Sequence, residues 1–289
     1  MREGGKVHKK ELYLGKKLPP NVKEVGEELR EQIFKERWQP LLDRIRDSYS
    51  REARLMPRSA REKEMDTFAI RFTYDTQRIE GSTLSLRETA TLLERGIAPR
   101  GRPVSDIREA EAHKKLFYEM LTHNGGDLSL NLIIEWHRKL FAETKPDIAG
   151  RIRKSRVGII AGSRFTPPLA VEVYPMLQDF FRWYSKNNKD RLLHPVELAA
   201  LVHLKFVTIH PFSDGNGRMS RLMMNFVLKR KGYPLLNIPY EGRDSYYNAL
   251  ERAQVGKNDD VFISWFARRY VKAHKEYLQN KKDVNSSLS

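Results

Sequence analysis

The amino-acid sequence predicts a mostly α-helical protein with one small β-hairpin. Along most of the 289 residues, apolar side chains recur at helical spacing between capping sequences and Gly or Pro stops. A β-branched run from Val157 to Ile160 interrupts this pattern, and residues 164–166 provide a second strand before two prolines. No internal repeat is visible, and one core with extensions suits a chain of this length.

Capping sequences and breakers place the helices in order along the chain. Residues 1–20 read as an extended lead-in, and Pro40 interrupts the first charged helix. Ser59–Glu62 and Ser85–Glu88 each fit a capping box that opens a helix. The stretch 195–209 is apolar nearly all round, which predicts a central, buried helix. Helices are expected near residues 22–53, 59–80, 85–96, 105–123, 129–142, 170–187, 195–209, 244–255 and 260–279, with another that ends at Gly232.

The composition sets several classes of protein aside. There is no cysteine, so a disulfide framework, a thiolate metal site and a cysteine nucleophile are excluded. No apolar run approaches the roughly 20 residues of a membrane helix. Residues 1–17 lack the apolar region of a signal peptide. We therefore expect a cytoplasmic protein with no membrane partner.

The formal net charge of +16 would attract polyanions. The basic residues are interleaved with acidic ones, however, which is typical of a solvated helical surface. Nucleic-acid binding is not expected, because no recognised nucleic-acid motif accompanies the charge. Acidic protein partners remain an alternative.

The segment His210–Arg221, HPFSDGNGRMSR, combines a tight polar loop with the start of a new helix. Gly215 and Gly217 allow unusual backbone angles and a close approach to a ligand. Amides at a helix N-terminus favour an anion, and Arg218 and Arg221 are spaced to share one face of the first turn. Two guanidinium groups beside such amides suit a polyphosphate.

Two further side chains of this loop supply chemistry. Asp214 offers a hard oxygen for Mg²⁺, which commonly bridges protein and substrate phosphates. His210 can act as a general base near neutral pH. Each feature alone is more often structural, as a helix stop, a common turn or a surface arginine pair. Their joint presence points to nucleotide chemistry at phosphorus.

This segment resembles the signature of Fic proteins, HxFx(D/E)GNGRxxR, at every defining position. The resemblance extends over about residues 68–267. It includes GRIRKSRVGIIAGSRFTPP at 150–168, which looks like the family's target-docking flap, and the helix HPVELAALVH at 194–203. It implies a Fic-type helical bundle that transfers AMP from ATP to a Ser, Thr or Tyr hydroxyl of a protein target, with Mg²⁺ as cofactor.

The resemblance also implies roles for individual residues. His210 would take the proton from the target hydroxyl, and Asp214 would hold Mg²⁺. The phosphates would be bound by Gly215, Asn216, Gly217, Arg218 and Arg221, and the nucleotide would be bordered by Ile159, Ile160, Gly162, Tyr246, Tyr247 and Gln254. The family usually has Asn at the position of Gln254, so this contact departs from its pattern.

The segment Thr76–Gly81, TQRIEG, matches the (S/T)xxxE(G/N) inhibitory motif of the same family. By itself the match describes an ordinary helix-end carboxylate. With the Fic signature downstream, it implies that Glu80 pairs with Arg221 and keeps this arginine from the γ-phosphate. The same glutamate would also allow a water molecule to remove AMP from a modified target.

The resulting organisation is an extension at 1–58, an inhibitory helix region at 59–96, a catalytic core at 97–279 and a disordered tail at 280–289. The expected partners are ATP and a protein hydroxyl, that of the chain itself included, and a homodimer stays open. Two alternatives remain. The same site could transfer UMP, GMP or a phosphocholine-type group, or the chain could be a non-catalytic basic binding module.

Overall fold

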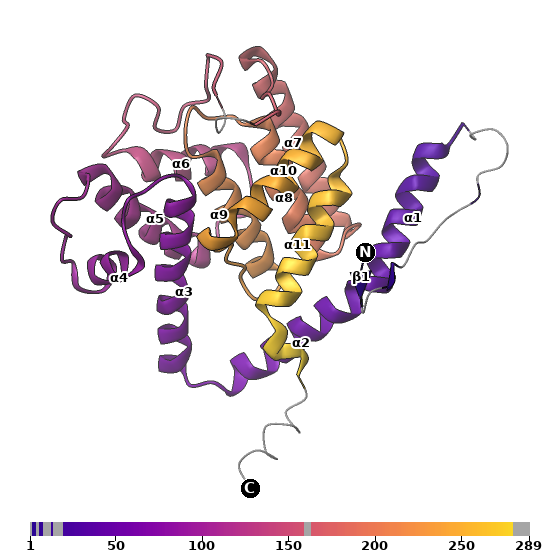
Figure 1. Ribbon diagram of the computed structural model, residues 1–289, viewed down its shortest axis with the longest axis horizontal. Coiled ribbons are helices and arrows are strands. Elements are labelled where there is room, and N and C mark those ends of the chain that lie inside the picture. The colour runs from indigo at the N-terminus through magenta and orange to yellow at the C-terminus, as the bar shows by residue number, and fades with distance from the viewer. Residues whose placement is uncertain (1, 4–5, 8–12, 14–19, 159–162, 280–289) are drawn as a thin grey trace, which may run out of the picture.

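The chain folds into a bundle of helices around a central pair (Figure 1). The computed structural model describes residues 2–3, 6–7, 13, 20–158 and 163–279. Its helices are α1 (Val22–Arg37), α2 (Gln39–Leu55), α3 (Arg58–Ile79), α4 (Leu86–Arg95), α5 (Val104–Thr122), α6 (Leu130–Phe141), α7 (Ala170–Asp190), α8 (Pro195–Ile209), α9 (Asn216–Arg230), α10 (Arg243–Gly256) and α11 (Asp259–Ala273). Short 3-10 helices follow at η1 (Tyr240–Gly242) and η2 (Lys275–Leu278), and β1 (Arg2–Glu3) pairs with β2 (Lys6–Val7) in an antiparallel ladder.

The central pair is α8 and α9, which pack against each other in the middle of the bundle. Helix α7 and helix α11 also cover α8, while α3, α5 and α6 contact α9. Apolar side chains on every side of α8 are buried, as the all-round apolar pattern predicts. The loop between these helices, residues 210–215, is therefore anchored at both ends by the core.

The helix limits confirm most of the predicted breaks. Helix α1 ends before Pro40, which lies in the first turn of α2 where its missing N–H costs nothing. The capping box at Ser85–Glu88 is formed, and Gly96 ends α4 in a left-handed conformation. The capping box predicted at Ser59–Glu62 is wrong. Pro57 already supplies the extended backbone at the helix start, so Ser59 lies inside the first turn of α3.

The β-hairpin predicted at 157–166 is not present in its described flanks, since residues 151–158 and 163–169 contain no strand. Its turn, residues 159–162, lies outside the described residues. Instead of ladder bonds, the buried Arg153 holds this segment by donating to the carbonyl oxygens of Pro168 and His210 at 2.6 Å each. Pro167 and Pro168 also lack the N–H groups that a second strand would use.

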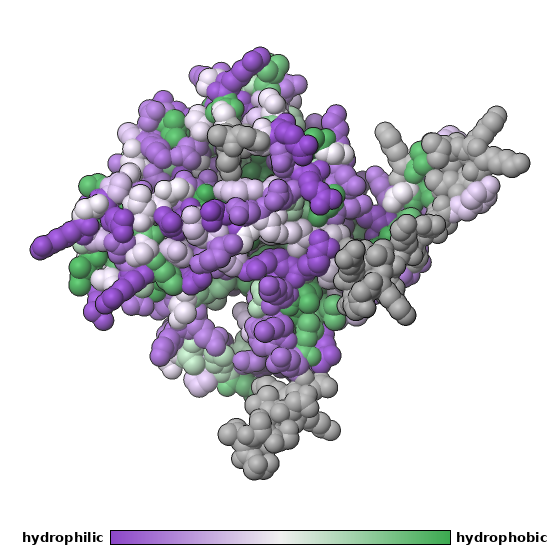
Figure 2. Space-filling model, in the orientation of Figure 1, coloured by the Kyte–Doolittle hydropathy of each residue, from purple (hydrophilic) through white to green (hydrophobic). Residues whose placement is uncertain are grey.

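Helix α1 extends to one side of the bundle (Figure 1), where Arg30 donates to the buried Glu197 of α8 at 3.1 Å. Hydrophilic residues cover most of the face in Figure 2, and hydrophobic ones form small separate areas. Within the described ranges, none of the helices is both long and apolar enough for a bilayer span. The predicted disordered tail, 280–289, lies outside the described residues.

Candidate active site

A cleft of about 670 Å³ opens beside the loop between α8 and α9. It is large enough for a small organic ligand. Segments far apart in the sequence meet in it, namely the end of α3, the loop itself and one face of α10. The residues predicted from the sequence that line it are Glu80, Gly81, His210, Asp214, Gly215, Asn216, Gly217, Arg221, Tyr246, Tyr247 and Gln254.

His210 follows α8 with a left-handed backbone, φ 52° and ψ 58°, which is uncommon for a residue with a side chain. Its Nδ1 lies 3.2 Å from the carbonyl oxygen of Val207. A carbonyl oxygen only accepts, so Nδ1 carries the proton and Nε2 keeps its lone pair. Burial lowers the pKa of His210, with Arg153 acting in the same direction. The imidazole is therefore neutral near pH 7 and able to accept a proton.

The loop holds its shape through side chains that bind its own backbone. The side-chain amide of Asn216 donates from Nδ2 to the carbonyl oxygen of Phe212 at 2.7 Å. Its Oδ1 accepts from the backbone N–H of Phe212 at 2.8 Å. Gly215 has φ 81°, and a β-carbon there would collide with the Phe141 ring. His137 Nδ1 accepts from the Gly150 N–H at 2.9 Å, so the ring proton is on Nε2. This Nε2–H donates to the Asp214 carbonyl oxygen at 3.0 Å.

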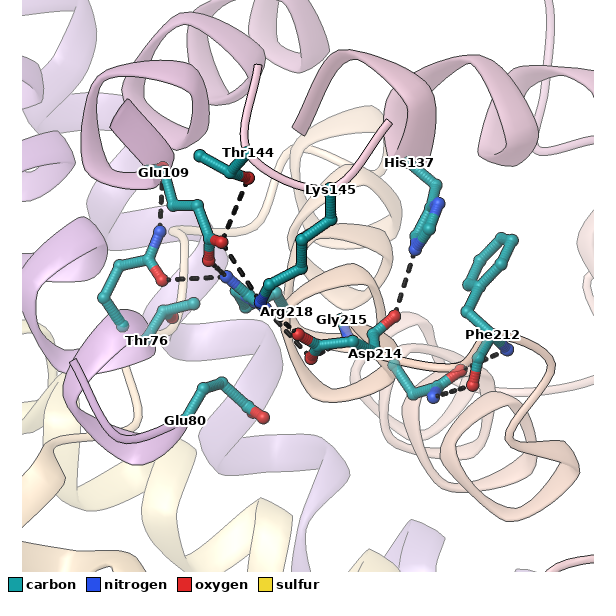
Figure 3. A network of polar contacts seen from close by, with 12 residues as sticks. Thr76, Glu80, Glu109, His137, Thr144, Lys145, Phe212, Asp214, Gly215 and Arg218 are labelled. Carbon is teal, nitrogen blue, oxygen red and sulfur yellow. Dashed lines mark hydrogen bonds and ion pairs between the residues drawn. The ribbon is translucent and has the colours of Figure 1, made fainter. Parts of the chain in front are cut away.

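The Asp214 carboxylate lies in a network of charged side chains (Figure 3). Arg218 Nη2 lies 3.0 Å from one of its oxygens, and Lys145 Nζ lies 2.6 Å from the other. Burial raises the pKa of Asp214, but Arg218 and Lys145 lower it by more, to about 2. Arg218 and Lys145 also pair with Glu109 of α5, whose carboxylate accepts from the Thr144 hydroxyl at 3.1 Å.

Arg221 is fully buried and points to the end of α3. Its Nη2 lies 2.6 Å from Glu80 Oε1 and also donates to the Thr76 carbonyl oxygen at 3.2 Å. Its Nε donates to the Thr76 hydroxyl at 3.3 Å, and its Nη1 donates to the Tyr246 hydroxyl at the same distance. Burial lowers the pKa of Arg221, but Glu80, Tyr246 and Tyr247 together raise it by more, so the guanidinium stays charged. The contact expected between Glu80 and Arg221 is thus formed.

The Glu80 carboxylate also lies against the first turn of α9. A β-carbon on Gly217 would collide with Glu80 Oε1, so only glycine leaves room for the carboxylate there. Gly217 is the second residue of α9, where free amides and the helix dipole favour an anion. Glu80 therefore occupies the place where a phosphate bound to this helix end would lie.

Helix α10 forms the opposite side of the cleft. Tyr247 donates from its hydroxyl to the Ile79 carbonyl oxygen at 2.9 Å, which ties α10 to the end of α3. The buried Tyr246 contacts Arg221 and lies 2.9 Å from His203 Nε2. Gln254 lines the cleft and donates to the Thr208 hydroxyl at 3.1 Å.

Arg218 is placed differently from the other predicted residues. Its side chain is 3% exposed and is absent from the cleft lining, because it points to Glu109, Gln77 and Asp214. The two arginines thus leave the same helical turn toward different neighbours. Ile159, Ile160 and Gly162 lie outside the described residues, while Gly158 and Ser163 on either side line the cleft.

Sequence reasoning missed four residues that support the loop: Lys145, Glu109, His137 and Arg153. None belongs to the loop signature or to the inhibitory motif, and each is at least 57 residues away from the residue of the loop or of α9 that it contacts. His137 and Arg153 are buried polar residues, but burial of this kind becomes visible only once the helices are packed.

The carboxylate of Asp214 suits a magnesium site with few protein ligands. Across the part of the chain that the structure describes, no group of three or more His, Asp or Glu side chains is arranged to hold an ion. Asp214 lines the cleft and is partly exposed, at 35% of its side chain. A single accessible carboxylate fits Mg²⁺ that is held mainly by water and substrate phosphates.

The fold and the cleft define a helical protein with a neutral histidine, an arginine and a helix N-terminus around one cavity. Residues 127–228 match the Fic/DOC family. The protein adenylyltransferase fic-1 of Caenorhabditis elegans is 34% identical over 221 residues, 75% of this chain and 42% of the relative. The protein adenylyltransferase Fic of Nematostella vectensis is 31% identical over 264 residues, 90% of this chain and 58% of the relative.

Solved structures show the same fold. A Fic domain containing signaling protein from Bacteroides thetaiotaomicron has a TM-score of 0.72 at 26% identity, covering 81% of this chain and 96% of that one. Fic-1 from C. elegans also has a TM-score of 0.72 at 26% identity, covering 92% and 76%. The chain belongs to the Fic/DOC family, and it spans about half the length of the curated relatives it matches.

Proposed function

We propose that this chain is a protein adenylyltransferase, which transfers AMP from ATP to a Ser, Thr or Tyr hydroxyl of a protein target. The observation that carries the proposal is the neutral His210, whose Nε2 has no hydrogen-bond partner among the described residues, in the same cleft as Arg221 and the N-terminus of α9. The names of the curated relatives support the choice of adenylyl transfer among reactions at phosphorus.

In the proposed reaction, the target oxygen attacks the α-phosphorus while His210 Nε2 accepts its proton. The new bond joins this oxygen to the α-phosphorus, and the bond to the bridging oxygen of the β-phosphate breaks, so pyrophosphate leaves with that electron pair. Amides at the start of α9 stabilise the phosphate charge. Arg218 does not line the cleft, so of the two arginines of the signature we expect Arg221 to contact the outer phosphates.

Mg²⁺ is the cofactor that the carboxylate of Asp214 would hold, together with phosphate oxygens. When bound, it would neutralise phosphate charge and help to orient the leaving group. Side chains of α6 and α9 orient Asp214 for this task, since His137 binds its carbonyl oxygen and Arg218 binds one carboxylate oxygen.

The resting form of the protein is proposed to be autoinhibited. The Glu80 carboxylate engages Arg221 and lies at the N-terminus of α9, so it competes with the outer phosphates for both. Thr76 holds the same guanidinium through its hydroxyl and carbonyl oxygens, which aligns it with Glu80. Removal of AMP with the help of Glu80 stays a prediction.

A labelling experiment tests the function. The Glu80→Gly variant is incubated with ATP labelled at the α-phosphate, Mg²⁺ and either no other protein or a cell lysate. Transfer of label to protein, lost in Glu80→Gly/His210→Ala, supports the proposal. A donor panel of UTP, GTP and a CDP-choline-type compound, each labelled in the group that would be transferred, separates adenylyl transfer from its alternatives. Absence of transfer with every donor would contradict an enzymatic role.

A further inference from the structure

Lys145 lies just after α6 in a short turn, where its backbone N–H binds the Phe141 carbonyl oxygen at 2.9 Å. Its Nζ reaches back to the loop, 2.6 Å from Asp214 Oδ2 and 3.2 Å from Glu109 Oε1, and 5.0 Å from the centre of the Phe141 ring. Figure 3 shows Lys145 and Arg218 converging on the Asp214 carboxylate. Neither the Fic signature nor the inhibitory motif contains Lys145.

Both oxygens of the Asp214 carboxylate are therefore engaged by cations. Oδ1 accepts from Arg218 Nη2, and Oδ2 accepts from Lys145 Nζ. With Glu109, the two carboxylates and the two cations form a set of four charges that sums to zero. A divalent ion that approaches Asp214 would add two positive charges to a neutral set and would meet the ammonium group of Lys145.

The two cations differ in how readily they can move. Arg218 is 3% exposed and is also bound to Gln77 and Glu109. Lys145 is 37% exposed, and its charge is carried on a flexible four-carbon stem. Lys145 is thus the cation that can leave Asp214 when another positive charge takes its place, while Arg218 stays.

We propose that Lys145 is an internal counter-ion that occupies the Asp214 oxygen needed by a divalent cation, so that the cation binds together with a nucleotide and only weakly before it. The negative charge of a triphosphate offsets the charge that the metal brings, whereas free metal has no such compensation. This inference rests on the proposed function, in which Asp214 is the metal ligand, and it makes Lys145 a positioning residue of that site.

The test measures binding of Mn²⁺ alone by electron paramagnetic resonance, with no nucleotide and no transfer reaction. Lys145→Met should bind Mn²⁺ about tenfold more tightly than the unchanged chain, because a repelling charge close to the site is removed. Lys145→Arg, which keeps the charge, should bind as weakly as the unchanged chain. Lys145→Gln gives a second neutral variant, and the thermal unfolding of each is measured to establish that it folds.

Lys139→Met is the matched control. Lys139 also contacts two carboxylates, Glu119 at 2.6 Å and Glu135 at 2.7 Å, but on an exposed face of α6. If Lys139→Met tightens Mn²⁺ binding as much as Lys145→Met does, the effect is one of general charge and the proposal fails. Equal or weaker binding by the folded neutral Lys145 variants also overturns it.

Asp214→Asn separates this inference from the proposed function. In the Lys145→Met background, Asp214→Asn should remove the gained Mn²⁺ affinity. If it does not, the metal role of Asp214 is wrong, and the inference about Lys145 falls with it. If Asp214 is required for Mn²⁺ binding but the neutral Lys145 variants gain nothing, only the inference about Lys145 is wrong.

Discussion

Two arginines near the start of α9, Arg218 and Arg221, have different surroundings. Arg218 is bound deep in the bundle by Glu109 and Asp214, and it does not line the cleft. Arg221 lines the cleft and is bound by Glu80, whose side chain remains 26% exposed. The pair between Arg218 and Glu109 is thus shielded from solvent, whereas the carboxylate that binds Arg221 is partly exposed.

Substitution of His210 should give the largest effect. In the Glu80→Gly background, His210→Ala should lower transfer by about 10²- to 10⁴-fold, because the base is lost while the phosphate contacts remain. The rate of label transfer measures this, and nucleotide binding by calorimetry serves as the control. Retained transfer would remove His210 as the base.

Removal of Glu109, the buried partner of Arg218, should reduce stability. Glu109→Ala takes an anion from the buried Arg218 and should lower the free energy of unfolding by about 3 kcal/mol. Urea unfolding followed by circular dichroism measures the loss, and it should not be accompanied by activation. An active, fully stable Glu109→Ala protein would show that the two sides of the loop do not differ as described.

Removal of Glu80, the partly exposed partner of Arg221, should raise activity. Glu80→Gly should increase transfer about tenfold or more, a size typical of regulatory coupling. Its unfolding free energy should also fall, because the fully buried Arg221 loses the Glu80 carboxylate, while Thr76 and Tyr246 continue to bind it. Initial rates with labelled ATP measure the increase. Unchanged rates would count against the inhibitory role of Glu80.

A pH profile should give the smallest effect. Burial lowers the pKa of His210 from its ordinary value of 6.5, so the base stays neutral and competent below that pH. The acid limb of kcat/KM for Glu80→Gly should therefore have its midpoint below pH 6.5, with the rate falling as His210 gains a proton. A midpoint above 6.5 would mean that a negative charge dominates its surroundings.

Local patterns predicted the parts of the site that are close in sequence. The loop at 210–215 follows from glycines and a helix start that lie within one segment, and the limits of α4 follow from its own capping box and Gly96. Two local predictions did not survive packing. Helix α3 begins directly after Pro57, so Ser59 lies inside the helix and does not cap it. In the described flanks of the expected hairpin, Arg153 donates to backbone carbonyl oxygens in place of strand pairing.

The contacts of the loop depend on segments that no local pattern links to it. Their spacing of three residues predicted that Arg218 and Arg221 both bind phosphates, but α5 and the end of α3 approach them from different directions. Lys145 lies 69 residues from Asp214 in the chain, and only the position of the turn after α6 brings its ammonium to the carboxylate.

By itself, the sequence determined the helical class, the central buried helix and the loop between α8 and α9, because each is encoded by residues within a few turns of one another. The family resemblance also predicted the pair between Glu80 and Arg221. Only the tertiary structure decided which other charges meet around that loop. Ion pairs form between side chains that packing brings within a few ångströms, and packing is set by the whole core and not by any one segment.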